Sequence, residues 1–340
     1  MPLLGTSGAA SARGFGFGAV AGITAYLANY VSTSNSYNKG TSAGIDSTGN
    51  AYITSTQYYC GTYLAMTKYD SKGVLQYARR IATPAISGIA TIDSSANIYT
   101  VCTNSPYMYL QKIDTGFSSV TWGQRIAGST CCYFYQDTSI VKVDSSGNVY
   151  AASKFIDNFA GYGVGIALFK YNSSGTLQWK KHYYGSLVGS EPQFNGPLGL
   201  ATDGSFVYVG GTCNFGGYYV PLIMKIDAST GTISWSKRLE GDGASNGAYM
   251  SVTTDGSGNV YACGYINASV GVIVKYDSTG AVTWQKSVSD GNYTWLQSIA
   301  LDTTGNVFVT GQKSSNLFIP VIKLNSSGTV QWQRQWSCST

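Results

Sequence analysis

Two short phrases alternate through this chain of 340 residues. Each contains an Asp or Asn and, after two or three further residues, a turn position that is mostly Gly. The first phrase runs into an apolar segment and occurs at 45–54, 92–101, 143–152, 201–210, 254–263 and 301–310. The second phrase ends in Trp or Tyr and occurs at 68–77, 112–122, 170–179, 225–235, 275–284 and 323–332. The period of roughly 50 residues is that of one small sheet per repeat, so the sheets must stack to bury their faces.

The phrases carry the chemistry of tight turns between alternating strands. The Asp or Asn accepts backbone N–H bonds, and Gly takes the left-handed conformation that closes a hairpin. Each repeat therefore predicts four strands, a to d, with its Trp or Tyr packed between neighbouring sheets. We predict an all-β protein, a single β-propeller of four-stranded blades over 22–340. Six blades fit the repeats, and seven stay open. The predicted repeats cover about 41–80, 88–126, 138–182, 197–239, 249–288 and 296–336.

The combined pattern, as in "VDSSGNVY" (143–150) followed by "KYNSSGTLQW" (170–179), resembles the short β-propeller repeats of bacterial and phage proteins. The resemblance covers about residues 41–336 and implies the propeller fold. It leaves the function open, because propellers serve as enzymes, lectins and scaffolds alike.

Composition excludes several kinds of site. The net charge is +5, and no run of Lys and Arg is longer than two, whereas a nucleic-acid-binding surface needs a basic stripe. The seven Cys form no C-x-x-C pair and there is one His, so we predict no metal site. Cys102 and Cys263 fall in apolar strand patterns and are expected to be reduced core residues. The state of Cys131 and Cys132 stays open.

The 16 acidic residues divide into two groups. Ten occupy the repeated turns, where one acid beside Ser and Gly indicates turn capping rather than calcium binding. They are Asp46, Asp70, Asp93, Asp114, Asp144, Asp203, Asp227, Asp255, Asp277 and Asp302. The other six lie in the b–c and d–a loops: Asp137, Asp157, Glu191, Glu240, Asp242 and Asp290. The chain lacks the common catalytic motifs, so we predict a non-enzyme with no catalytic residue and no cofactor.

Those same loops are rich in aromatic residues, and in a propeller they emerge on one face, opposite the tight turns. Tyr beside Ser, Gly and Asn is typical of paratopes, and aromatic rings also stack on sugars. The alternative is that these rings only cover the blade ends. The predicted ligand or partner face consists of Tyr58, Tyr59, Tyr63, Tyr107, Tyr109, Tyr133, Phe134, Tyr135, Tyr162, His182, Tyr183, Tyr184, Tyr218, Tyr219, Tyr293 and Trp295.

The N-terminal region contains an uncharged stretch, residues 14–31, that is just long enough to span a membrane. Its residues 22–30 align with 328–336, so that Tyr26 meets Trp332. We therefore predict an extra outer strand at 22–30 rather than a membrane span. The start of the chain has no basic region before an apolar one, so we predict no signal peptide.

Residues 1–21, with the core "ARGFGF", resemble the Gly/Ala leaders of tail-associated and other virion proteins of marine phages. The resemblance implies a docking segment with Arg13, Phe15 and Phe17 as anchors, and other virion proteins as partners. The hypothesis is a non-enzymatic virion component, made in the host cytoplasm, oligomeric in the assembly, and presenting its aromatic face to protein, host glycan or receptor. The alternative is a bacterial propeller that binds or cleaves carbohydrate, with Glu240/Asp242 or Asp137/Asp157 as its acid pair.

Overall fold

The structure is a computed structural model that describes most of the chain as strands. The described residues are 38–57, 63–82, 87–104, 106–128, 132–134, 139–157, 163–184, 193–215, 217–239, 246–267, 269–289, 294–313 and 318–337. They form 25 strands, and none of them belongs to a helix that could cross a membrane. The predicted docking segment 1–21 and extra strand 22–30 lie outside these residues.

The strands form six antiparallel sheets, each in the order a-b-c-d, which confirms the all-β fold and six blades. Blade 1 contains β1 (Asn38–Ile45), β2 (Ala51–Gln57), β3 (Tyr63–Tyr69) and β4 (Leu75–Ala82). Blade 2 contains β5 (Ser87–Ile92), β6 (Ile98–Asn104), β7 (Tyr107–Ile113) and β8 (Val120–Ala127). Blade 3 contains β9 (Cys132–Phe134), β10 (Ile140–Val143), β11 (Val149–Asp157), β12 (Gly163–Tyr171) and β13 (Leu177–Tyr184).

The remaining three blades each contain four strands. Blade 4 contains β14 (Gln193–Thr202), β15 (Phe206–Phe215), β16 (Tyr218–Asp227) and β17 (Ile233–Arg238). Blade 5 contains β18 (Ala248–Thr254), β19 (Val260–Ile266), β20 (Val270–Tyr276) and β21 (Val282–Val288). Blade 6 contains β22 (Thr294–Leu301), β23 (Val307–Lys313), β24 (Phe318–Leu324) and β25 (Val330–Ser337).

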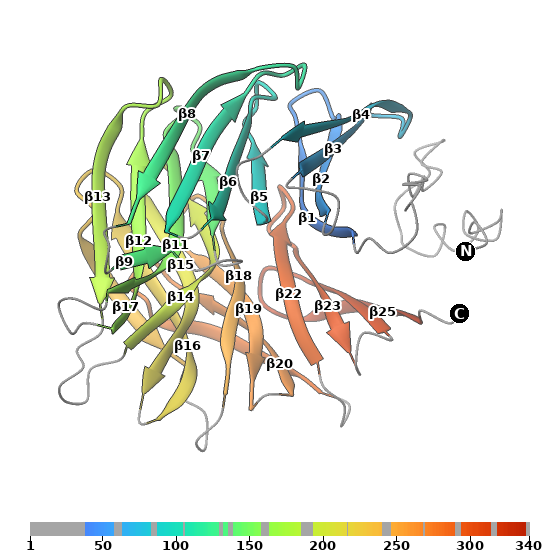
Figure 1. Ribbon diagram of the computed structural model, residues 1–340. Helices are drawn as coiled ribbons and strands as arrows, with labels where there is room; N and C mark the ends of the chain where they lie inside the picture. The colour runs from blue at the N-terminus through green and yellow to red at the C-terminus, as the bar shows by residue number, and fades with distance from the viewer. Residues whose placement is uncertain are drawn as a thin grey trace. The chain divides into compact units, whose positions relative to one another are not determined.

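The chain divides into two compact units. Unit 1 comprises residues 1–104 and 108–126, and unit 2 comprises residues 105–107 and 127–340. Within unit 2 the blades pack in chain order: β14 lies against β12, β18 against β14, and β22 against β18 (Figure 1).

Blade 3 departs from the regular pattern in its strand a. Both β9 and β10 pair with the same edge of β11, with Phe134 opposite Phe155 and Ile140 opposite Ala152. Strand a is therefore made in two pieces, and this blade begins before the predicted start at residue 138.

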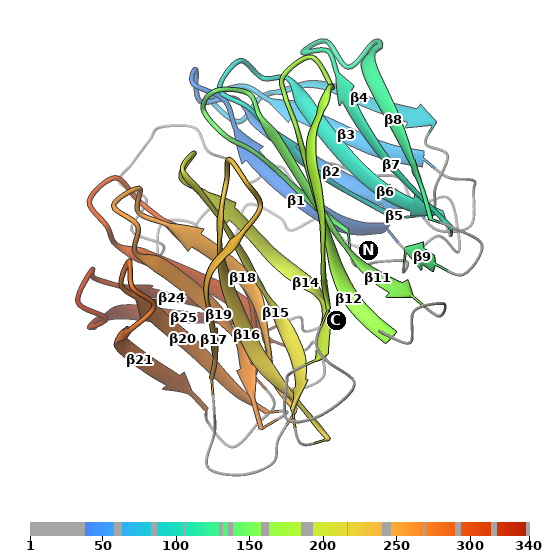
Figure 2. The same ribbon diagram turned by 90° about the vertical axis from the view of Figure 1, so that its left-hand side faces the viewer.

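The tight turns have the predicted geometry. In the turn between β10 and β11, Gly147 donates its N–H to the carbonyl oxygen of Asp144 and has a φ of 80°. Blade 2 has Ala96 and Phe117 at the two equivalent positions, with φ of 62° and 54°, which is unfavourable for a residue that carries a Cβ. In each blade the a–b and c–d turns lie at the same end of the strands, which for blades 4 to 6 is at the upper left in Figure 2.

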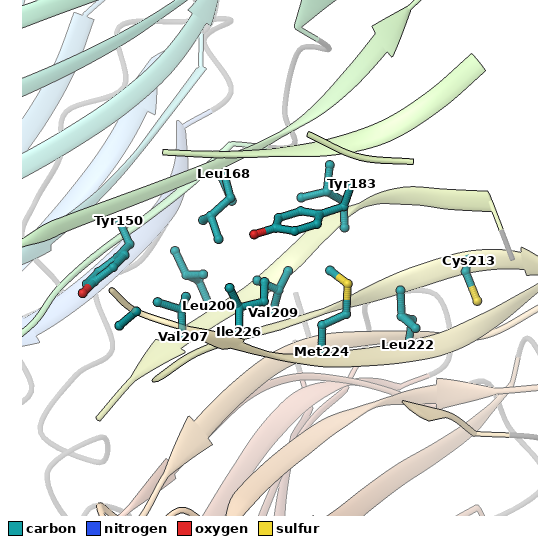
Figure 3. Close-up of a cluster of buried hydrophobic side chains, with 13 residues drawn as sticks. Tyr150, Leu168, Tyr183, Leu200, Val207, Val209, Cys213, Leu222, Met224 and Ile226 are labelled. Atoms are coloured by element: carbon teal, nitrogen blue, oxygen red, sulfur yellow. The ribbon is translucent and has the colours of Figure 1, made fainter. Parts of the chain in front are cut away.

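The hydrophobic core lies between successive blades. Figure 3 shows the cluster between blades 3 and 4, where Leu168 of β12 faces Leu200, Val209 and Met224 of blade 4. All four side chains are at most 1% exposed. Cys213 belongs to the same cluster, and Cys102 and Cys263 are likewise buried free thiols, as predicted for the latter two.

Hydrogen bonds join neighbouring blades at the aromatic residue of strand d. The indole N–H groups of Trp179, Trp235 and Trp284 donate to the carbonyl oxygens of Ala228, Ser278 and Ser326, in the c–d turn of the following blade, across 3.1, 3.1 and 3.2 Å. In unit 1, the Tyr77 hydroxyl donates in the same way to Thr115. These contacts confirm that the repeated aromatic residue packs between blades.

A Tyr on strand b and a Lys on strand c lie together beside these contacts, and the sequence prediction missed both roles. In blade 3 the hydroxyl of Tyr150 donates to Asp144 of the a–b turn across 3.2 Å. Lys170, directly opposite Tyr150 in the sheet, places Nζ 5.5 Å from the centre of that ring. The same Nζ donates to the Ala228 carbonyl oxygen that already accepts from Trp179. One carbonyl of the next blade thus accepts two donors.

Candidate functional site

The two ends of the blades differ in chemistry. We call the end with the a–b and c–d turns the turn edge, and the end with the b–c and d–a connections the loop edge. At the turn edge, Asp302 accepts bonds from the Asn306 amide across 2.7 Å and the Thr304 hydroxyl across 2.8 Å. The hydrogen bond from Asn306 is the main cause that lowers the pKa of Asp302 to about 2. Asp302 therefore caps its own turn, the role predicted for the acids of the repeated phrases.

Part of the predicted aromatic face lies outside the described residues. Outside the described residues lie Tyr58, Tyr59, Tyr135, Tyr162 and Tyr293, together with the docking residues Arg13, Phe15 and Phe17. Tyr63 and Tyr133 lie on β3 and β9. Tyr107 and Tyr109 lie on β7, both partly exposed. The described remainder belongs to blades 3, 4 and 6.

In blade 3, aromatic rings gather at the end of β13. The imidazole of His182 is exposed and stacks on Phe155, with ring centres 4.4 Å apart and planes 22° from parallel. The hydroxyl of Tyr184 lies 3.4 Å from His182 Nδ1. The prediction placed His182 and Tyr184 at this edge and missed Phe155, because its strand pattern indicates only a core residue.

Two predicted face residues of blade 3 are interior residues instead. Phe134 is 1% exposed and packs against Phe155 and Phe169. Tyr183 is 8% exposed and lies in the cluster between blades 3 and 4 (Figure 3). Its hydroxyl donates to the carbonyl oxygen of Gly231 across 2.7 Å. The reason is the two-residue period of β13, which puts Tyr183 on the same side as Trp179 and His182 on the other side.

In blade 4, the β15–β16 hairpin presents exposed rings. Tyr218 and Tyr219 are 45% and 44% exposed. On the partner strand, Phe215 lies opposite Tyr218, and the guanidinium carbon of Arg238 lies 3.7 Å from the centre of the Phe215 ring. Such a cation–π contact fixes the orientation of both groups. Neither Phe215 nor Arg238 was predicted as a site residue.

An aromatic pair bridges blades 5 and 6. Trp295 of β22 is 36% exposed and stacks on Tyr265 of β19, with ring centres 5.2 Å apart and planes 27° from parallel. The Thr294 N–H donates to the Ser269 carbonyl oxygen across 2.9 Å, which ties the backbone beside Trp295 to blade 5. The indole is therefore both accessible and held in place. Tyr265 was missed because it sits at the end of a buried strand pattern.

The described residues hold no group of three or more His, Cys, Asp or Glu that could ligate a metal. The side chains of the predicted acid pairs, Asp137/Asp157 and Glu240/Asp242, lie outside the described part of the chain. What the loop edge offers chemically is flat apolar surface beside hydroxyl, imidazole and guanidinium groups, which suits contact with a partner.

Comparison with solved structures supports the fold. The Dos1 propeller is 10% identical with a TM-score of 0.54, over 87% of this chain and 69% of that one. Hydrazine synthase of Kuenenia stuttgartiensis is 12% identical with a TM-score of 0.56, over 82% and 75%. A quinonprotein alcohol dehydrogenase-like protein of Bacteroides thetaiotaomicron is 13% identical with a TM-score of 0.50, over 88% and 66%. At these identities the likeness concerns the fold alone.

No curated protein sequence matches the chain. A family model does match: residues 167–339, just over half of the chain, fit the PQQ_2 repeat model, described as outer membrane protein assembly factor BamB. The matched residues include all of blades 4 to 6 and the end of blade 3. The turn carboxylates, the inter-blade Trp contacts and this match agree, and the chain belongs to the PQQ_2 family of β-propeller repeat proteins.

Proposed function

We propose that this chain is a non-enzymatic structural and recognition component of a phage virion, which contacts a protein or glycan partner through the loop edge of its propeller. The observation that carries the proposal is the Trp295–Tyr265 pair, an exposed indole held by a second ring and by backbone bonds to the neighbouring blade. Rings fixed before binding lose little conformational entropy when a partner covers them.

The state of the described carboxylates supports a role without catalysis. A general acid needs a pKa near the working pH, which burial or a like charge supplies. Two acids of the turns have pKa values far below neutral pH, because hydrogen bonds lower the pKa of Asp227 and of Asp302 to about 2. Their oxygens are held by neighbouring backbone and side-chain donors, so these groups serve the turns.

The virion role rests on the leader, residues 1–21, and its resemblance to virion proteins. Gly in this segment allows close approach to another backbone, and Phe15 and Phe17 provide apolar anchors. The buried free thiols of Cys102, Cys213 and Cys263 fit folding in a reducing cytoplasm, as for particles assembled inside a host.

Particle incorporation tests the structural part of the proposal. The full chain and a variant without residues 1–21 are produced in infected cells, and particles are purified by density gradient. We expect the full chain to sediment with particles and the shortened chain to stay in the soluble fraction while retaining its β-sheet circular dichroism. Incorporation of the shortened chain, or absence of the full chain from particles, would refute the docking role.

Binding measurements test the recognition part. The full chain is applied to a glycan array and to separated virion proteins, with Trp295→Ala as the test variant. Val330→Ala is the matched control, because Val330 is 49% exposed at the turn edge. We expect Trp295→Ala to weaken the observed binding about tenfold and Val330→Ala to leave it unchanged, since a stacked ring contributes about 1–3 kcal/mol. Equal binding by all three proteins would contradict a loop-edge contact.

A further inference from the structure

The fourth strand of each blade carries basic residues and no acidic ones. The six strands β4, β8, β13, β17, β21 and β25 contain no Asp or Glu. Their basic residues are Arg79, Arg80, Arg125, Lys180, Lys181, Lys237, Arg238, Lys286 and Arg334. Each strand contributes only one or two of them, which is why the linear sequence shows no basic stripe. In unit 2 the strands follow in blade order, so their charges form a series.

Within unit 2, one cation recurs at an equivalent position in every blade. Lys181, Lys237, Lys286 and Arg334 each lie two residues after the Trp of their strand, and all four are exposed. We call these four residues the basic series. Because side chains two apart point to the same side of a strand, each cation projects on the side of its Trp. In blades 3 to 5 that side faces the c–d turn of the next blade.

The stems of two of these cations are held against the next blade. A Cβ at Gly231 would lie 2.7 Å from Cγ of Lys181, and a Cβ at Gly280 would lie 2.9 Å from Cε of Lys237. Long stems packed on a neighbouring turn leave the charged head at the surface. Holding the stem also reduces the entropy that a flexible Lys loses when it binds an anion.

The acids of the turn edge offset this charge only in part. The turns that face Lys181 and Lys237 contain Asp227 and Asp277, whose carboxylates accept hydrogen bonds from donors of their own turns. The c–d turn of blade 6, which follows the strand of Lys286, has the neutral Asn325 at the same position. Charged residues on outer strands also prevent sheets from pairing edge to edge, but acids do this as well. The single sign of the charge adds attraction for anions.

We propose that the basic series of unit 2 binds an acidic polysaccharide that runs across the outer strands of blades 3 to 6. The proposal names a ligand class for the recognition role above and therefore rests on it. Packed sheets are about 10 Å apart, so the cations recur at about that interval or more. Duplex DNA carries one charge per about 1.7 Å, far denser than the series. A polysaccharide with one acidic sugar in each disaccharide is sparsely charged and matches better.

Blade 3 also supplies an exposed ring on its outer strand. His182 projects on the opposite side of β13 from Lys181 and on the same side as the exposed Lys180, and it stacks on Phe155. A flat ring and a cation on the same side of one strand can meet the face of one sugar and the carboxylate of the same or the next sugar. Arg238 on β17, held over Phe215, repeats this pairing of ring and cation in blade 4.

The test uses the full chain and hyaluronate, a polysaccharide with one carboxylate in each disaccharide. Neutral dextran and a single-stranded DNA of 30 nucleotides are measured alongside by biolayer interferometry. We expect binding to hyaluronate alone and a loss of affinity with added salt. Lys237→Gln with Lys286→Gln should weaken binding about tenfold, because two of the four cations are lost and each contact is weakened by solvent screening. Lys72→Gln, an exposed lysine at the turn edge of blade 1, should change binding less than twofold.

Each other outcome overturns the proposal in a distinct way. DNA binding with the same lysine dependence and no hyaluronate binding would assign the surface to nucleic acid. If Lys72→Gln weakened binding as much as the double variant, binding would depend on the overall positive charge and not on the basic series. If a partner bound through Trp295 and hyaluronate did not bind, this inference would be overturned and the proposed function would stand. If no partner bound and the chain did not enter particles, both the inference and the proposed function would be overturned. The salt dependence of hyaluronate binding is measured on the unmodified chain, so this part of the test does not depend on whether a variant folds.

Discussion

The indole N–H of Trp235 donates to the carbonyl oxygen of Ser278 across 3.1 Å, and this bond ties blade 4 to blade 5. The six-membered ring of the same indole lies over Gly280, where an added Cβ would be 3.0 Å from Cδ2 of Trp235. Gly280 also has a φ of 84°. The glycine is thus required both by its backbone conformation and by the ring that covers it.

Replacing this glycine should cost more than replacing an uncovered one. Gly256 in the same blade has a φ of 76° and no atom within 4 Å of an added Cβ. We expect Gly256→Ala to lower the free energy of unfolding by about 1–2 kcal/mol through backbone strain alone. Gly280→Ala should lower it by a further 1 kcal/mol or more, roughly, because the indole must shift. Urea unfolding measures both, and equal losses would contradict the packing role of Trp235.

The shared acceptor predicts a specific non-additivity. The ammonium of Lys225 donates to the same Ser278 oxygen across 3.1 Å. Trp235→Phe or Lys225→Met alone leaves that carbonyl with one donor, so each should cost only about 1 kcal/mol. The double variant leaves the carbonyl unsatisfied and should cost about 1–3 kcal/mol more than the sum. The control pairs Lys225→Met with Trp284→Phe, whose acceptor is Ser326, and there the two effects should add.

Blade 2 contains strain that a substitution can remove. Ala96 has a φ of 62° at a position where the other a–b turns of this form use Gly. We expect Ala96→Gly to stabilise the protein by up to about 1 kcal/mol. Phe117 has a φ of 54° but is 3% exposed in the core of unit 1, so Phe117→Gly should destabilise by about 3–5 kcal/mol. Thermal unfolding of both variants measures these changes in stability. A lower melting temperature for Ala96→Gly would contradict backbone strain at Ala96.

Acid should weaken the fold through the turn carboxylates. Hydrogen bonds from Ser229 and Thr230 lower the pKa of Asp227 to about 2, from 3.8. A lowered folded-state pKa gives stability that is fully present above about pH 4 and is lost as the pH falls through 2. Asp227→Asn should make the free energy of unfolding fall less steeply at acid pH, because Asn does not take up a proton there. The turn itself should form in this variant, because all four hydrogen bonds reach Oδ1, an oxygen that Asn also has. The chain itself uses Asn172 and Asn325 at this position. Unchanged acid sensitivity in the variant would contradict the assignment.

Alkali should act through the buried tyrosines. Burial, with the hydrogen bond to Asp46, raises the pKa of Tyr52 to about 12. A raised folded-state pKa gives stability that is present below pH 10 and is lost as the pH rises through 12. Tyr52→Phe should shift the alkaline unfolding midpoint upward while costing some stability at neutral pH, and blade 6 has Phe308 at the equivalent position. Circular dichroism between pH 9 and 12.5 would show no shift if Tyr52 does not contribute.

The fold was predictable because its determinants are local. Asp144, Gly147 and their equivalents set the hairpins through bonds within five residues, and six copies of the repeat favour six blades. The Tyr and Lys contacts were not predicted, since Tyr150 and Lys170 meet only after strands b and c have paired. The split strand a of blade 3 was also missed, because β9 has three residues and no turn phrase before it.

The candidate site was predicted only in part. Exposure at the ends of strands depends on the two-residue alternation, which would have separated His182 from Tyr183 once Trp179 was assigned to the blade interface. The ring beneath Trp295 comes from the preceding blade, about 30 residues earlier, so no local pattern indicates it. The basic series was missed for the same reason, because its members are about 50 residues apart.

The contacts between blades place unequal demands on their two sides. The donor side chain is Trp in blades 3, 4 and 5, whereas the acceptor is the backbone carbonyl of an Ala in one blade and a Ser in the next two. A carbonyl is present in every residue, so the acceptor residue is free to change without loss of the bond. A duplicated repeat would therefore bring both a Trp donor and a carbonyl acceptor for its neighbours. Such a chain can gain or lose whole blades during evolution by duplication or deletion.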